Sequence, residues 1–233
     1  MSTRRPTALS APLAALILGL LAGGCQSSVQ SPRQTPRAIV EKQPVAFADR
    51  TFDPANPPPD MPPLAPGEEA ECESNFLSDV NIGGRTLKTD ATHALVTVTH
   101  IKMTLQLKVT IWTPADATPH VIEHEQGHRQ IAEYYYQTAG ELAQRIAEPY
   151  MAETVEVTGT DLNAESTKRF QQVASQIANE YSKELNPDPA QLLYDGITDH
   201  GRNDVVVKDA VASSIKNVAA DSPQPAPAAS LGN

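Results

Sequence analysis

The chain has 233 residues, a formal net charge of −10 and 40% hydrophobic residues, which is consistent with one domain of ordinary size flanked by tails. Because an acidic protein repels the phosphate backbone, the charge argues against nucleic acid as a partner. Only two cysteines are present, Cys25 and Cys72, which excludes a framework of several disulfides as the source of stability.

Residues 1–25 have the layout of an export signal. Two arginines precede a mostly apolar run over 8–22, which is too short to span a membrane comfortably. Small residues then lead to Cys25, as in a bacterial lipoprotein signal, where this cysteine is lipidated and becomes the mature N-terminus. Gln26 follows it, which favours the outer membrane and a site facing the periplasm. Ordinary signal cleavage near Ala22 is the alternative.

Residues 26–71 are rich in Pro, Gln, Ser and Ala, a composition that buries too little apolar surface to fold. We predict a disordered tether there and a disordered tail over 216–233. The folded domain is therefore expected to span 72–215.

The domain begins with a strand pattern. From Leu95 to Trp112 apolar residues recur at every second position, which predicts a β-strand with one buried face. Because eighteen residues is long for one strand, a bend or hairpin is expected within it. Residues 154–158 predict a second, short strand or a loop.

Two long helices are predicted. Thr118 is a good N-terminal cap and Pro119 suits a first turn, so the helical pattern is expected to run from about His120 to about Ala147. A second helix is expected over 163–185, ended by two prolines. The segment 190–202 is predicted to be irregular.

The first helix contains a His-Glu-x-x-His motif made by His124, Glu125 and His128. Four residues advance a helix by about 400°, so both imidazoles emerge about 40° apart on neighbouring turns. This arrangement suits two bonds of about 2.0–2.1 Å to one zinc ion. Glu125 points about 100° away from His124, where it can take a proton from a zinc-activated water without binding the metal.

A catalytic zinc needs a third protein ligand, and four residues are candidates. His120 lies about 12 Å along the axis from His128, so a straight helix cannot bring both to one ion. Glu133 falls on the back of the helix, where it is expected to support the site or to pack. Asp161 is more typical of a helix cap. His200, free of helix geometry, can approach the metal from another direction.

Two blocks of sequence resemble the bacterial domain of unknown function numbered nine hundred and twenty-two. They are HEQGHRQIAE (124–133) and YDGITDHG (194–201), although Arg129 stands where that family usually has an aromatic residue. Members of the family are described as secreted zinc-dependent proteases with a zincin-like motif. The resemblance implies that His200 is the third zinc ligand. It also implies that Tyr194 and Asp195 support the ligands or the oxyanion, with simple packing of Tyr194 as the alternative.

Together these observations predict an α+β domain of zincin type, with a small, mainly antiparallel sheet, the zinc-motif helix and a second long helix. The predicted function is zinc-dependent hydrolysis of a protein or peptide in the cell envelope. By analogy with similar proteases, the substrate is expected to pair with a sheet edge in the region 95–112. Two alternatives stay open: a zinc-holding module that binds without cutting, and a structural lipoprotein without metal.

Overall fold

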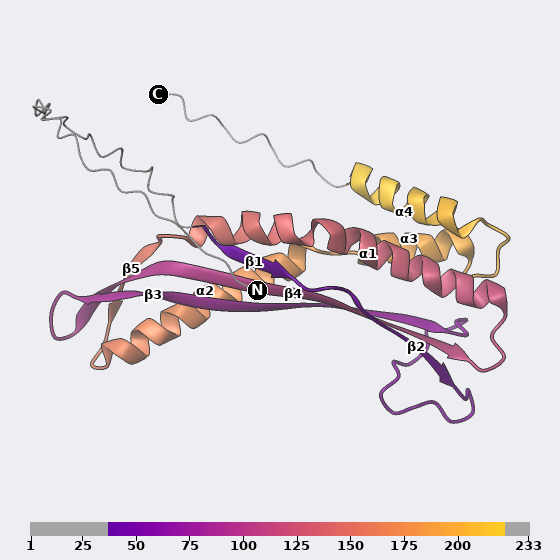
Figure 1. Ribbon diagram of the computed structural model, residues 1–233, viewed down its shortest axis with the longest axis horizontal. Helices are drawn as coiled ribbons and strands as arrows, with labels where there is room; N and C mark the ends of the chain where they lie inside the picture. Colours follow the sequence, from indigo (N-terminus) through magenta and orange to yellow (C-terminus); the bar gives the residue numbers. More distant parts are fainter. Residues whose placement is uncertain (1–36, 222–233) are drawn as a thin grey trace, which may run out of the picture. The chain divides into compact units, whose positions relative to one another are not determined.

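The computed structural model describes residues 37–221 (Figure 1). The predicted signal peptide, the lipidation site Cys25 and residues 222–233 lie outside the described residues. The elements, in chain order, are β1 (Ile39–Lys42), β2 (Ala46–Phe52), β3 (Glu71–Lys88), β4 (His93–Pro114), α1 (Pro119–Ala147), the short 3-10 helix η1 (Glu148–Tyr150), β5 (Thr154–Thr158), α2 (Leu162–Glu184), α3 (Asp188–Thr198) and α4 (Val207–Asp221).

All described strands pair with β4, which lies at the centre of one five-stranded sheet. β3 runs antiparallel to it along one side. On the other side β5 is antiparallel, whereas β1 and β2 are parallel to β4. The α+β class is therefore confirmed, but the mainly antiparallel sheet is not, because the two N-terminal strands make the sheet mixed.

These two strands also correct the predicted tether over 26–71. β1 and β2 belong to the folded unit, and Phe52 at the end of β2 is buried. The prolines break the strands instead of unfolding the segment, because the free side of β4 supplies backbone partners that composition cannot reveal. The boundary at 215 is wrong as well, since α4 continues to Asp221 and buries Ala210, Val211 and Ser214.

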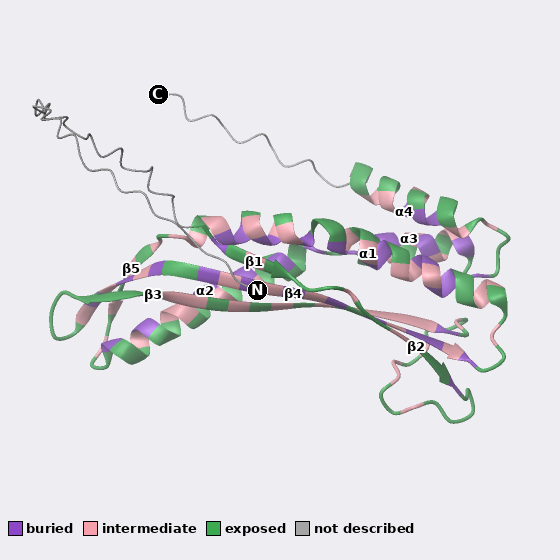
Figure 2. Cartoon of the chain, viewed as in Figure 1, coloured by how far each residue is buried: buried purple, intermediate pink, exposed green. Residues whose placement is uncertain are grey.

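β4 is a single strand of 22 residues without the expected bend or hairpin. Its hairpin with β3 comes earlier, between Lys88 and His93, and a bulge at Gly83 and Gly84 adjusts the register. Buried residues alternate with less buried ones along β4 (Figure 2), as the period-two pattern predicts from Ile101 onward. Before that point the phase is reversed, because Thr99 and His100 are both exposed at the bulge and the buried residues are Ala94, Val96 and Val98. The buried face carries a row of apolar side chains, namely Ile101, Met103, Leu105, Leu107, Val109 and Ile111.

The two long helices cover this face. Thr118 caps α1 by accepting a hydrogen bond from the backbone N–H of Val121, as predicted. α1 and α2 join the sheet in one apolar core, to which α2 contributes Val173, Ile177 and Tyr181. No helix among the described residues combines the length and apolar character that a membrane span requires.

The segment 190–202 is not irregular: most of it forms helix α3. α3 and α4 lie beside α1 (Figure 1), joined to it by a second apolar cluster around Ile131, Tyr194 and Ala210. This packing places α3 directly against the part of α1 that carries the histidine motif.

Candidate metal centre

The site forms where α3 packs on the first turns of α1. A β-carbon added at Gly127, inside the motif, would overlap the hydroxyl of Tyr194, so only glycine permits this close approach. The Tyr194 ring stacks on the His124 ring, with centroids 5.1 Å apart, and its hydroxyl donates to the His124 carbonyl oxygen. This bond fits the packing interpretation of Tyr194 and not the oxyanion role.

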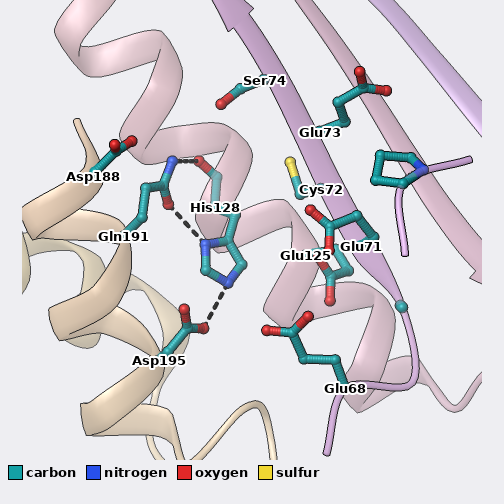
Figure 3. Close-up of a pocket in the computed structure, with 12 residues that line it drawn as sticks. Glu68, Glu71, Cys72, Glu73, Ser74, Glu125, His128, Asp188, Gln191 and Asp195 are labelled. Carbon is teal, nitrogen blue, oxygen red and sulfur yellow. Dashed lines mark hydrogen bonds and ion pairs between the residues drawn. The ribbon is translucent and has the colours of Figure 1, made fainter. Parts of the chain in front are cut away.

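Three donor atoms converge at this interface. The Nε2 atoms of His124 and His128 lie 3.2 Å apart. Oδ1 of Asp195 lies 2.8 Å from Nε2 of His128 (Figure 3) and 3.4 Å from Nε2 of His124. Tetrahedral zinc with bonds of about 2.0–2.1 Å holds its ligand atoms about 3.3–3.4 Å apart. Two of the three separations, 3.2 Å and 3.4 Å, match this spacing, and zinc binding would widen the third, the 2.8 Å contact between Asp195 and His128.

The opposite nitrogen of each imidazole is held by α3. The Gln191 side chain donates to the His128 carbonyl oxygen, so its own Oε1, 2.7 Å from His128 Nδ1, accepts from the ring. Thr198 donates its hydroxyl to the Tyr194 carbonyl oxygen, which leaves its oxygen, 3.3 Å from Nδ1 of His124, to accept as well. These acceptors orient both rings to donate from Nδ1, and in the neutral form of each ring this turns the Nε2 lone pair toward Asp195.

This arrangement leaves three hydrogen-bond acceptors facing one another in a buried place. Oδ1 of Asp195 is fully enclosed, and despite its contact with His128 it receives no hydrogen bond of acceptable geometry. Such an orphaned acceptor is costly unless a cation lies between the groups. The donor set therefore fits the chemistry of zinc, which prefers imidazole and carboxylate ligands.

The electrostatics of this interface also favour the ionised form of Asp195. Burial alone raises the pKa of Asp195, but the neighbouring imidazoles of His124 and His128 outweigh it and hold that pKa below its usual range. For His128, burial lowers the pKa and the Asp195 carboxylate raises it, with an upward net shift. Asp195 is thus held as the carboxylate, the form that binds a metal.

Glu125 lies in α1 beside this centre and is buried. Burial raises its pKa to about 8; the charge of His128 opposes this, and Glu71 and Glu68 reinforce it. Burial and Glu68 also raise the pKa of Glu71, at the start of β3, to about 7. A cavity of about 350 Å³ joins these groups (Figure 3). It brings Glu125 and His128 together with the first residues of β3 and with Asp195.

His200 lies just beyond α3, in a left-handed backbone conformation with φ of 54°. Its Nδ1 is 3.4 Å from Oε1 of Glu68 and 3.9 Å from Oδ1 of Asp195. Among the described residues, compact donor groups join His200 with Glu68 and Asp195, and His124 with His128 and Asp195. The geometry therefore gives the third place beside the two motif histidines to Asp195, which the sequence suggested only as a supporting residue.

The other residues that the sequence suggested as third zinc ligands lie outside the cluster of His124, His128 and Asp195. Asp161 caps α2, as expected, by accepting from two backbone N–H groups. Glu133 pairs with Arg129, whose guanidinium lies 3.8 Å from the centre of the Phe47 ring. That contact places an aromatic ring from β2 beside Arg129. His120 belongs to neither donor group.

Cys72, on β3, lines the cavity beside Glu125. Burial raises the pKa of its thiol, which therefore stays protonated and is a poor metal ligand in this state. This environment is that of an incidental thiol and not of a metal ligand.

Sequence reasoning missed Gln191, Thr198 and the donor role of Asp195 because it did not recognise α3. The signal exists in hindsight, since residues 191, 195 and 198 follow helical spacing and form one polar stripe. Glu68 and Glu71 were missed for another reason. They lie in the segment interpreted as a tether, and only the pairing of β3 with β4 brings them to the site.

Comparison with known proteins adds no relative: no family model, curated protein or solved structure matches the chain. The resemblance to the domain of unknown function therefore stays a prediction that rests on the two sequence blocks.

Proposed function

We propose that this protein is a zinc-dependent hydrolase of peptide bonds, with His124, His128 and Asp195 as the zinc ligands. One observation carries the proposal: two imidazole nitrogens and one carboxylate oxygen face one another within 3.4 Å, and the enclosed carboxylate oxygen has no hydrogen-bond partner. Bound zinc would supply Lewis acidity, which polarises a carbonyl group and lowers the pKa of water. We also propose that the domain is related to the zincin type of zinc protease.

Glu125 is the proposed general base. It lines the same cavity as His128, and the upward shift of its pKa favours proton uptake. Its carboxylate takes a proton from water as the oxygen attacks the carbonyl carbon. It then delivers this proton to the amine nitrogen that leaves when the peptide bond breaks.

The sheet edge at the site belongs to β3, not to the region 95–112. β4 has β3 on one side and other strands along most of the opposite side, so it cannot accept a substrate strand. The cavity touches four consecutive residues of β3, from Glu71 to Ser74. Because successive side chains of a strand point to opposite faces, such a cavity lies against the edge of the strand.

An extended polypeptide is therefore the proposed substrate. In an antiparallel ladder every second residue of β3 directs its N–H and C=O away from β4, where a peptide can pair with them. Such pairing would hold a peptide beside Glu125 and His128. The proposed location in the cell envelope, with a lipid anchor at Cys25, rests on the sequence alone.

The test separates cutting from binding. The full chain, prepared without a histidine tag, is loaded with zinc and incubated with a panel of denatured proteins, with and without chelator. Wild type and the control variant Glu133→Gln should bind zinc and cut. Glu125→Gln should bind zinc equally well and lose turnover.

Three results would contradict the proposal. A Glu125→Gln variant with full activity would refute the mechanism. Zinc binding without any cutting would favour the non-catalytic binding module. A wild-type chain that retains no metal would favour the structural lipoprotein.

A further inference from the structure

We propose that Glu68, Asp195 and His200 form a second divalent-cation site, which shares the carboxylate of Asp195 with the first. The proposal rests on the function proposed above only for the identity of the first site. The segment before β3, helix α3 and the turn after α3 contribute one ligand each, so all three ligands of the second site lie outside the histidine motif.

The donor atoms of this group lie close enough together to share one ion. Nδ1 of His200 lies 3.4 Å from Oε1 of Glu68 and 3.9 Å from Oδ1 of Asp195, and all three atoms fall within 4.8 Å of one another. A separation of 3.9 Å is too long for a hydrogen bond. It also exceeds the separation of about 3.3–3.4 Å between ligand atoms of a tetrahedral zinc, whereas the 3.4 Å between His200 and Glu68 matches that spacing, so a bound ion would draw His200 and Asp195 slightly together.

Hydrogen bonding does not explain the group. Nδ1 of His200 and Oδ1 of Asp195 are both fully enclosed atoms without a hydrogen-bond partner. The two side chains face the same point. Each of these atoms therefore loses its contact with water and gains no hydrogen bond in exchange. A cation bound between them and Glu68 would satisfy both.

The acidic groups around the site, if all were ionised, would also carry more charge than one ion can offset. Glu68, Glu71, Glu125 and Asp195 line one cavity, and its other ionisable neighbours include two more carboxylates, Glu73 and Asp188. A single divalent ion would balance only half of the charge of the first four carboxylates when they are ionised. A second ion would balance the rest.

Asp195 is suited to hold two ions because a carboxylate oxygen has two lone pairs and its second oxygen is a further donor. Ions bridged in this way lie about 3.5–4 Å apart in two-metal enzyme sites. One imidazole and two carboxylates suit a divalent first-row transition metal such as zinc, manganese or cobalt. The second ion would also tie the segment before β3 to the end of α3.

The experiment counts bound metal. The metal-free full chain without a histidine tag is titrated with Zn²⁺, unbound ions are removed, and metal per chain is measured by mass spectrometry. Wild type should hold two ions. Glu68→Gln and His200→Asn should each hold one, and asparagine is chosen because it tolerates the left-handed conformation of residue 200. Glu69→Gln changes an exposed neighbour and should still hold two.

A second measurement tests the shared ligand. The same chain is loaded with two equivalents of Co²⁺, and the two ions should show magnetic coupling in electron paramagnetic resonance if Asp195 bridges them. Two uncoupled ions would overturn the shared carboxylate. Circular dichroism of each variant confirms that a lost ion does not reflect a lost fold.

The results separate this inference from the proposed function. If wild type saturates at one ion and Glu125→Gln still loses turnover, the second site is overturned and the hydrolase stands. Two ions in both Glu68→Gln and His200→Asn would overturn the assignment of these ligands. A wild-type chain that binds no metal would overturn both proposals.

Discussion

Helix α1 meets two kinds of surroundings along its length. Its C-terminal half places Ala132, Tyr136, Ala139 and Ala143 against the apolar face of β4 and α2. Its N-terminal half turns His124 and His128 toward polar side chains of α3. Burial of apolar surface is non-directional and tolerates small shifts, whereas the N-terminal half depends on hydrogen bonds that hold each ring in one orientation. The difference teaches that stability and metal binding can be changed separately in this one helix.

The largest expected effect falls on the polar end. Asp195→Ala should weaken zinc binding by more than about 100-fold, because it removes a ligand and not merely an outer hydrogen bond. Chelator competition measures the change. Unfolding monitored in the absence of metal should shift little by comparison. Unchanged zinc affinity would exclude Asp195 as a ligand and return His200 to that place.

The apolar end should respond in the opposite way. Leu105→Ala, in the fully buried row of β4, should lower the free energy of unfolding by about 2–5 kcal/mol, because it leaves a cavity in a packed core. Urea unfolding measures this. Leu192→Ala, at a residue that is 71% exposed, is the matched control and should change stability by less than about 0.5 kcal/mol. Zinc affinity of the folded Leu105→Ala protein should stay within a few-fold of wild type.

The hydrogen bonds from α3 to the rings should have an intermediate effect. Gln191→Leu removes both contacts to His128 with little change in volume, so zinc affinity should fall about 10–100-fold. Competition with a chromophoric chelator gives the affinity. The control Gln171→Leu lies on the exposed face of α2 and should bind as wild type. Equal affinities in the two variants would argue that ring orientation does not depend on α3.

The smallest effect is expected at the start of α1. Thr118→Ala should lower the free energy of unfolding by about 1 kcal/mol, because the backbone N–H of Val121 loses its capping acceptor. Thr118→Ser keeps the hydroxyl and should restore most of the loss. Thermal unfolding distinguishes the two variants. A fall in zinc affinity larger than the fall in stability would show that the cap also positions the histidine motif.

Much of the fold could be predicted from local pattern. Period-two alternation identified β4, capping residues and helical spacing identified α1 and α2, and the motif placed His124, Glu125 and His128 correctly within one helix. The pattern failed where pairing partners decided the outcome. β1 and β2 lie in a proline-rich segment, and they are ordered because β4 offers them an unpaired side.

The sequence by itself determined the two imidazoles and the glutamate of the motif, because their spacing on a helix depends only on helix geometry. Only the tertiary structure decided which carboxylate meets them. Asp195 and His200 are close together in the chain, and local rules cannot tell which one points to the motif. The packing of Tyr194 into the gap at Gly127 sets the rotation of α3, and that rotation brings Asp195 to the histidines and His200 to Glu68.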